Sequence, residues 1–291
     1  MDEKDWAMFM TIVEEKSITQ AAEKLYISQP ALSYRLKNLE TEIGANLIIR
    51  TSNGILLTPQ GEAFLKYVEN MRKQSSQIRD YIKGMGSSVQ GTLHIGCSGI
   101  FAHYELAPIL KDFLQQYPMV EVNVRTGLSH KVMRMLEKEE ITVAILRGSY
   151  PWTGNRILIQ EEPICLVNKE PITFEELPKH PRISYLTDQP LLRSIEAWIK
   201  ENFKNPLPVT MQLDSMDTCR QFVLNGLGWS ILPYMGLSGA DDVFTQRITF
   251  KDGTPLTRKT EMLYHKEAMN LSAVKAFIYF LTERYKNNCK I

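Results

Sequence analysis

SITQAAEKLYISQPALSYRLKNLE (residues 17–40) contains two short amphipathic segments that meet across a polar turn. The second segment begins at Ser28, whose hydroxyl can accept a hydrogen bond from the free N–H groups of a first helical turn. Pro30 fits that turn because its missing N–H costs nothing there. Apolar residues follow at three- and four-residue spacing on one helix face, namely Ala31, Leu32, Leu36, Leu39 and Ile43. The stretch therefore predicts a helix-turn-helix.

The same helix leaves polar side chains on its other faces. When a helix-turn-helix docks on DNA, the N-terminal residues of its second helix enter the major groove, where amide and guanidinium groups reach base edges. We therefore expect Gln29, Ser33 and Arg35 to contact bases. The alternative is a small three-helix unit that carries these polar residues without binding DNA, because short helical patterns are easily matched.

A β-hairpin and a further helix are predicted for residues 47–65, LIIRTSNGILLTPQGEAFL. Two apolar runs flank a turn at residues 52–54, and Thr58 followed by Pro59 marks the start of the helix. The hairpin makes the domain a winged helix-turn-helix. The helix is expected from residue 59 to about residue 83, and its long apolar stripe predicts pairing with a second copy of the chain.

The first 90 residues carry no excess of positive charge. They contain 11 Lys and Arg against 11 Asp and Glu, whereas a nonspecific nucleic-acid binder is strongly basic. The acidic residues gather in the first two predicted helices and most of the basic residues follow later. Affinity for DNA should therefore depend on a few placed cations and on the dimer, with a modest dependence on salt.

The composition of the whole chain is that of a globular protein. Its 291 residues are 44% hydrophobic and carry a net charge of +1. No uncharged apolar run reaches about 18 residues and the start MDEKDW is acidic, so we expect a cytoplasmic protein without a membrane segment. The cysteines at 97, 165, 219 and 289 have neither disulfide nor zinc spacing, and we expect no metal and no cofactor.

A second domain is expected after the Gly- and Ser-rich residues 84–88. Strand and helix patterns alternate from residue 91, which predicts α/β structure with a largely parallel sheet. The expected domains are a winged helix-turn-helix over 1–58, a linker (dimerisation) helix and hinge over 59–88, and a regulatory domain over 89–291. The last has two α/β lobes, about 91–162 plus 268–291 and 163–267, with a cleft between them.

Three runs carry a resemblance to a known family: AAEKLYISQPALSYRLKNLE, the wing ending in LTPQGE, and the domain opening GTLHIGCSG. Together they resemble the LysR-type transcriptional regulators, over the whole chain. The resemblance implies a bacterial cytoplasmic regulator that binds promoter DNA as a homodimer or homotetramer. It also implies a C-terminal effector domain, similar to periplasmic binding proteins, that senses a small molecule.

The resemblance assigns the DNA contacts to residues of the second helix and the wing. Pro30 would contact a thymine methyl group, Ser28 would cap the helix and contact a phosphate, and Arg50 would neutralise a phosphate. Asn53 and Leu56 stand where many family members carry basic or polar residues, so this wing lacks a cation at its tip. The full expected set is Ser28, Gln29, Pro30, Ser33, Tyr34, Arg35, Lys37 and Arg50.

An effector site is expected at the carboxyl ends of the strands, where helix N-termini favour an anion. Ser129 follows the second strand, and Arg147 follows the third and would supply a fixed positive charge. The expected set is Ser98, Gly99, Ile100, Ser129, Arg147, Leu186 and Thr187. We expect an effector that bears carboxylates, such as citrate or another organic acid. Alternatively, Ser98 and Ser129 are ordinary helix caps, and Arg147 is a surface residue paired with Glu139 or Glu140.

Two other classes of protein use similar two-lobed domains. A solute-binding or sensor protein would leave the winged N-terminal domain unexplained. A small-molecule enzyme would need a catalytic or nucleotide-binding motif, and the chain has no G-x-G-x-x-G after a strand, no P-loop, no G-x-S-x-G and no H-E-x-x-H. We therefore expect a regulator without catalytic residues.

Overall fold

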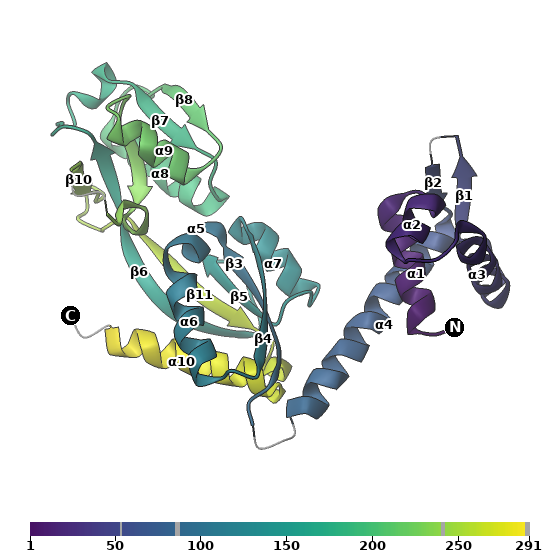
Figure 1. Cartoon of the computed structure of the whole chain (residues 1–291). Coiled ribbons are helices and arrows are strands. Elements are labelled where there is room, and N and C mark those ends of the chain that lie inside the picture. The colour runs from purple at the N-terminus through teal and green to yellow at the C-terminus, as the bar shows by residue number, and fades with distance from the viewer. Residues whose placement is uncertain (53, 85–87, 240–241, 289–291) are drawn as a thin grey trace. The chain divides into compact units, whose positions relative to one another are not determined.

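The structure is a computed structural model that describes residues 1–52, 54–84, 88–239 and 242–288 (Figure 1). It divides into an N-terminal unit, Met1–Asp80, and a C-terminal unit, Tyr81–Ile291. The wing residue Asn53, the linker residues 85–87 and Cys289 lie outside the described residues. The two units are a winged helix-turn-helix and a two-lobed α/β domain, as the sequence predicted.

Three helices and a hairpin pack against the start of a long helix in the N-terminal unit (Figure 1). The elements are α1 (Glu3–Glu15), α2 (Ile18–Lys24), α3 (Gln29–Ile43), β1 (Ile48–Thr51), β2 (Gly54–Leu57) and α4 (Pro59–Gly84). Their shared core includes Phe9, Leu32, Leu36 and Phe64, all buried. Ala31 and Ile43, which we expected on the buried face of α3, are exposed, because the core contacts of α3 come from its central turns.

The caps predicted from the sequence form as hydrogen bonds. The Ser28 hydroxyl accepts from the backbone N–H of Ala31 at 3.3 Å, and the Thr58 hydroxyl accepts from that of Gly61 at 2.9 Å. Each bond satisfies one of the N–H groups that a helix start leaves without a partner. These caps fix where α3 and α4 begin.

The first lobe of the C-terminal unit is a sheet covered by helices on both faces. Its strands are β3 (Gly91–Ser98), β4 (Val120–Gly127) and β5 (Val143–Arg147), which pair in parallel, followed by β11 (Thr257–Tyr264) and the first half of β6 (Asn155–Asn168). β11 pairs antiparallel with both β5 and β6. Helices α5 (Gly99–Phe101) and α6 (Ala107–Gln116), joined by the π-helix η1 (Ala102–Leu106), pack with α10 (Ser272–Asn288) on one face; α7 (Ser129–Glu137) packs on the other. The sheet is therefore less parallel than the sequence predicted.

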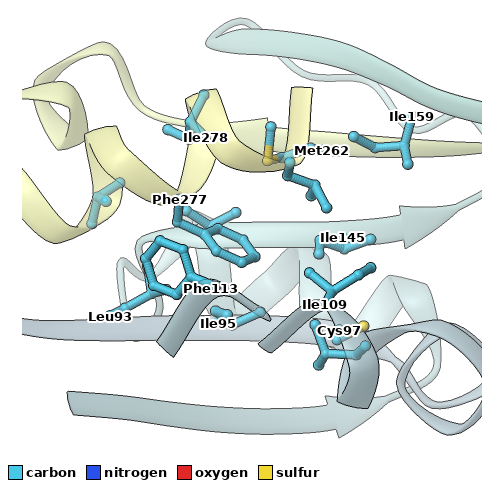
Figure 2. Close-up of a cluster of buried hydrophobic side chains, with 14 of the residues drawn as sticks. Leu93, Ile95, Cys97, Ile109, Phe113, Ile145, Ile159, Met262, Phe277 and Ile278 are labelled. Atoms are coloured by element: carbon cyan, nitrogen blue, oxygen red, sulfur yellow. The ribbon is translucent and has the colours of Figure 1, made fainter. Parts of the chain in front are cut away.

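Alternate residues of β5 contribute to two different hydrophobic cores, one on each face of the sheet. Ile145 joins the core beneath α6 and α10, whereas Leu146 joins the core beneath α7, because successive strand residues point to opposite faces. In the first core, Phe113 of α6 and Phe277 of α10 meet edge to face with ring centroids 5.2 Å apart (Figure 2). Both helices are thus held on the sheet by aromatic contacts as well as by apolar burial.

The second lobe is built on the far half of β6. Strands β9 (Ser230–Pro233) and β10 (Phe244–Arg247) pair with β6 there, and β7 (Arg182–Tyr185) pairs with β8 (Val209–Leu213). The helices are α8 (Gln189–Asn202) and α9 (Met216–Leu224), with short 3-10 turns η2 (Leu177–Lys179) and η3 (Tyr234–Leu237); a further turn, η4 (Lys266–Asn270), precedes α10. Among the described helices, none is long and apolar enough to cross a membrane.

Two strands, β6 and β11, connect the lobes (Figure 1). β6 pairs with β11 up to Pro163 and with β9 from Ile164, so its partner changes where the sequence predicted the first lobe to end. The chain returns earlier than the predicted residue 268, because β11 pairs with β5 from Thr260 onward. The crossing strands thus place their side chains at the junction of the lobes.

Gly96 of β3 lies where α7 and the residues after it pack tightly against this sheet. A Cβ at Gly96 would lie 2.2 Å from Cδ1 of Ile141 and 2.7 Å from Cγ1 of Val132, whereas a Cβ at Gly99 would meet open space. Gly96→Ala should therefore lower the free energy of unfolding of the C-terminal unit by about 1–3 kcal/mol through overpacking. Gly99→Ala is the control and should change it little. Urea unfolding followed by tryptophan fluorescence measures both, and equal midpoints would contradict the packing.

Candidate functional site

Helix α3 presents a polar ridge on the side that faces away from the core. Gln29, Pro30, Tyr34 and Lys37 are all exposed, and Tyr34 exposes 69% of its surface. Pro30, Tyr34 and Lys37 are close to one helical turn apart and Gln29 adjoins Pro30, so the four form one continuous strip. An exposed amide, an aromatic ring and a lysine on one strip can contact base edges, methyl groups and phosphates.

A groove lies between α3 and the wing strand β1. It has a volume of about 440 Å³ and is lined by Ser33, Tyr34, Leu36, Lys37, Glu40, Asn46, Ile48 and Arg50. The Ser33 hydroxyl accepts hydrogen bonds from Nε2 of Gln29 and from Nη2 of Arg50, both at 3.4 Å. Arg50 on the wing and Lys37 on the helix therefore flank the groove with two cations.

Arg35 lies on a different side of α3 from this ridge. Its Nε donates to Oδ1 of Asp5 at 2.8 Å, and its Nη2 donates to Oδ1 of Asp2 at 3.2 Å. These bonds hold the guanidinium against the start of α1. Tertiary packing thus uses this side chain to join α1 to α3, an arrangement that does not favour the base contact that the sequence predicted for Arg35.

The C-terminal unit contains four buried charged side chains at the junction of its lobes. Arg147 at the end of β5 is fully buried and donates through Nη2 to Oε1 of Glu162 on β6. Arg258 on β11 donates through Nη2 to Oδ2 of Asp188 at 2.7 Å, and Asp188 precedes α8 in the second lobe. We call these four residues the junction cluster. Burying such charges is costly unless they are paired, and each has its partner here.

Several polar atoms of the junction cluster and its neighbours have no hydrogen-bond partner among the described residues. The donors are Nε and Nη1 of Arg147, Nε of Arg258 and the hydroxyls of Tyr150, Tyr185 and Thr260, and the one acceptor is Oδ1 of Asp188. Buried polar groups are almost always paired in folded proteins. Such a concentration of orphan donors makes the junction a candidate site for a polar, acceptor-rich ligand.

Ser129 and Arg147, which the sequence assigned to one site, do lie together. The Ser129 hydroxyl accepts a hydrogen bond from the backbone N–H of Arg147 at 3.1 Å, and Ser129 is fully buried. Ser98 is also buried, and its side chain makes no helix cap. The alternative in which both serines are ordinary caps is wrong, and so is a surface pairing of Arg147, because Arg147 is buried against Glu162.

The remaining predicted effector residues border the junction less closely. Ile100 packs against the cores of both lobes, and Gly99 is exposed at the start of α5. Thr187 is partly buried, whereas Leu186 exposes 55% of its surface. Of the predicted effector residues, Ser98, Ser129 and Arg147 are therefore buried more deeply than Leu186 and Thr187 of the second lobe.

Sequence reasoning missed Glu162, Asp188, Arg258, Tyr150 and Thr260. Glu162 and Arg258 stand inside strand-forming runs, EEPICLVN and TRKTEMLYH, where a charge has no obvious place. A charge in a buried strand requires a partner, and that requirement was the available clue. The identity of each partner depends on strand pairing, because Arg147 on β5 and Glu162 on β6 come together only when β11 inserts between these two strands in the sheet.

The lobes also touch through side chains beyond the ion pairs of the junction cluster. The Tyr104 hydroxyl on η1 donates to Oδ1 of Asp217 on α9 at 2.7 Å. Nδ1 of His130 on α7 lies 3.6 Å from Oδ1 of Asp188. Two helical segments of the first lobe, η1 and α7, therefore contact the second lobe.

Burial shifts the ionisation of the groups around the cluster. It raises the pKa of Tyr185 to about 12, although Arg258 and Arg147 act in the opposite direction. It also raises the pKa of the Tyr150 hydroxyl, with the Asp188 carboxylate adding to the effect. Both tyrosines therefore remain protonated near neutral pH and present O–H donors.

Two family profiles match the chain, one for each unit. Residues 4–62 match the profile described as "Bacterial regulatory helix-turn-helix protein, lysR family". Residues 86–286 match the profile described as "LysR substrate binding domain". Together the two matches span nearly the whole chain.

The curated relatives are regulators. The chain is 38% identical over 281 residues to the uncharacterized HTH-type transcriptional regulator YraN of Bacillus subtilis (strain 168), covering 97% of both chains. It is 27% identical over 261 residues to the HTH-type transcriptional regulator IlvY of Escherichia coli (strain K12), covering 85% of this chain and 87% of that one.

Solved structures share the fold at lower sequence identity. Full-length CbnR complexed with its target DNA matches with a TM-score of 0.73 and 17% identity, covering 97% of this chain and 99% of that chain. Full-length AphB, a virulence activator of Vibrio cholerae, matches with a TM-score of 0.62 and 19% identity, covering 98% and 100%.

A double-mutant cycle on Arg147 and Glu162 tests the buried pairing. Arg147→Met should destabilise the C-terminal unit by about 3–5 kcal/mol because it strands a buried carboxylate, and the added Glu162→Leu should recover much of that loss. The exposed pair Arg125 and Glu140, with Nη1 and Oε2 2.8 Å apart, is the control. Its cycle of alanine variants should give a coupling below about 1 kcal/mol. Equal couplings in the two urea-unfolding cycles would contradict the buried pairing.

Proposed function

This chain belongs to the LysR family of bacterial transcriptional regulators, and we propose how it performs that role. Helix α3 and the wing bind promoter DNA, and a small carboxylate-bearing effector held at the junction cluster controls that binding. The family consists of regulators rather than enzymes. DNA binding places its activity in the cytoplasm, where the bacterial chromosome lies.

The exposed ridge of α3 is the observation that carries the DNA-binding part of the proposal. Gln29, Ser33 and Tyr34 would read base edges, Pro30 would contact a thymine methyl group, and Ser28 would contact a phosphate at the helix start. Lys37 and Arg50 would neutralise phosphates along the groove that they flank. Arg35 is left out of the reading set because Asp5 and Asp2 hold it.

Self-association follows from the outer end of α4. Ile78, Tyr81 and Ile82 expose 52%, 40% and 60% of their surfaces on this helix. A second copy of α4 would cover such an apolar stripe. We propose a homodimer, or a homotetramer built from dimers, in which paired α3 helices reach two half-sites of one promoter.

The effector part of the proposal rests on the orphan donors of the junction cluster. A carboxylate can accept up to four hydrogen bonds, and Arg147, Arg258 and Tyr185 all have donors without partners among the described residues. The paired charges of the cluster sum to zero, so a ligand with one carboxylate fits better than citrate with its three. This refines the organic acid that the sequence suggested.

Effector binding would act by shifting a conformational equilibrium. The junction cluster lies where the two lobes meet, so a ligand there contacts both lobes at once. A ligand shifts an equilibrium only by its difference in affinity for the two states. A ligand can contact Arg147 of one lobe and Tyr185 of the other at the same time only when the lobes are close together. Its binding therefore favours the closed domain.

Removing groove cations should weaken DNA binding without changing sequence preference. Lys37→Ala and Arg50→Ala should each lower affinity for all sequences and reduce the slope of log K against log salt by about one, because each removes one phosphate contact. Binding is measured on a fragment that the wild-type protein selects from random DNA. Lys24→Ala is the control, because Glu14 and Glu15 already hold this lysine at 3.2 and 2.6 Å. A slope unchanged by Lys37→Ala and Arg50→Ala would refute the placement.

Replacing Arg147 by lysine should weaken effector binding while keeping the charge. Lysine cannot supply the fixed fork of N–H donors, so we expect at least about a tenfold loss of affinity for the effector. Thermal shift with a panel of organic acids finds the effector on the wild type, and calorimetry compares the variants. Arg125→Lys, in an exposed pair with Glu140, is the control. Equal affinities of wild type and Arg147→Lys would discard the role of Arg147.

A further inference from the structure

We propose that the effector is an α-amino acid, whose carboxylate binds the arginine side of the junction cluster and whose ammonium group binds Asp188. This inference rests on the proposed effector role of the junction cluster and narrows the ligand from an organic acid to a zwitterion. The charged side chains of both halves, Asp188, Arg147 and Arg258, are nine-tenths buried or more.

The acceptor half of the site is Oδ1 of Asp188. Asp188 is only 4% exposed, and this oxygen has no hydrogen-bond partner in the described part of the chain, although Oδ2 is bonded to Arg258. The Tyr150 hydroxyl faces Asp188 and Ser129 without a hydrogen bond of normal geometry to either. An unshared carboxylate oxygen beside a tyrosine hydroxyl can accept a charge-assisted hydrogen bond from an ammonium group.

The donor half of the site consists of the two guanidinium groups and the residues around them. Nε and Nη1 of Arg147 and Nε of Arg258 have no acceptor among the described residues, and neither have the hydroxyls of Tyr185 and Thr260. Thr260 and Arg147 are paired residues of adjacent antiparallel strands, so their side chains point to the same face. A single carboxylate can accept several of these bonds at once.

The acceptor half of the site and part of the donor half belong to one ion pair. Nη2 of Arg258 and Oδ2 of Asp188 are 2.7 Å apart, so the orphan Nε of Arg258 and the orphan Oδ1 of Asp188 belong to two planar groups in direct contact. A ligand whose ammonium group and carboxylate are attached to the same carbon can therefore reach both groups at once.

Charge balance favours a zwitterion over a simple acid. The cluster has two guanidinium groups and two carboxylates, so it is neutral as a whole, and a buried uncompensated charge is costly. A simple carboxylic acid would bring a net negative charge close to the unshared oxygen of Asp188. An amino acid brings no net charge and satisfies that oxygen as well as the donors.

Nearby charged groups leave this balance intact. His130 is the one further titratable side chain that contacts the Asp188 carboxylate among the described ion pairs; Nδ1 lies 3.6 Å from Oδ1, and the side chain is 47% exposed. Asp217 is bonded to Tyr104 on the other side of the lobe contact. Neither supplies a buried cation that would compensate a ligand with a net negative charge.

Matched ligand pairs test the proposal on the full-length protein. Each of the twenty standard L-amino acids that has a stable 2-oxo acid is compared with that acid by thermal shift, and every hit is compared with its N-acetyl derivative by calorimetry. We expect one amino acid, or a related group, to bind about 10- to 100-fold more tightly than its 2-oxo acid, because the ammonium group adds charge-assisted hydrogen bonds. The N-acetyl derivative should bind as weakly as the 2-oxo acid.

Asp188→Asn is the variant that should remove this discrimination. It keeps the size of the side chain but loses the charge that binds an ammonium group, so the amino acid and its 2-oxo acid should bind it with similar affinity. Asp112→Asn is the control, since it removes the same charge from a pair with Arg284 in the first lobe. It should retain the wild-type preference. If Asp188→Asn folds poorly, the comparison of each amino acid with its 2-oxo acid on the wild-type protein still tests the proposal.

The outcomes separate this inference from the proposed function. A 2-oxo acid or another amine-free acid that binds as tightly as any amino acid, with Arg147→Lys weakening it, overturns the amino-acid inference and leaves the carboxylate effector in place. Failure of every amino acid and organic acid to bind overturns both. Preference for an amino acid that persists in Asp188→Asn also overturns the assignment of the ammonium group to Asp188.

Discussion

Two buried ion pairs on the crossing strands are the constraint on which the C-terminal unit depends. Arg147 and Glu162 tie β5 to β6, and Arg258 and Asp188 tie β11 to the start of α8. A charge removed from water is tolerated only with a partner, so neither pair can open without a large penalty. The lobes are therefore joined at a point where their separation would strand charges. A ligand that satisfies the remaining donors there acts on the most sensitive contact between the lobes.

The charged residues of the N-terminal unit are arranged differently from those of the C-terminal unit. The charges of the first 90 residues sum to zero, and the structure uses several of them within the N-terminal unit. Arg35 joins α3 to α1 through Asp5, and Lys24 is held by Glu14 and Glu15. Only placed cations such as Lys37 and Arg50 flank the groove beside α3. Internal ion pairs thus fix the orientation of α3, and a small number of exposed groups remain for the proposed DNA contacts.

In both units, ion pairs fix the position of a surface, and the groups proposed to bind DNA or the effector lie outside those pairs. In the N-terminal unit the exposed ridge of α3 is set by the cap at Ser28 and by the buried face around Leu36. In the C-terminal unit the orphan donors are set by strand pairing. In a regulator, ligand binding to the C-terminal unit must influence DNA binding by the N-terminal unit. A ligand that changes how the lobes meet supplies a free-energy difference, and a dimer can transmit that difference.

The sequence by itself determined the local elements. The Ser28 cap, the apolar period of α3 and the start of α4 at Pro59 are short-range patterns whose physics lies within one or two helical turns. It also placed Ser129 and Arg147 at the ends of successive strands of the chain, because parallel strands end at the same edge of a sheet. Only the tertiary structure decided which charges pair. Arg258 is 111 residues from Arg147, whose carbonyl it binds at 3.3 Å, and Arg35 meets Asp5 across 30 residues. Such partners follow from nonlocal packing, which no local pattern encodes.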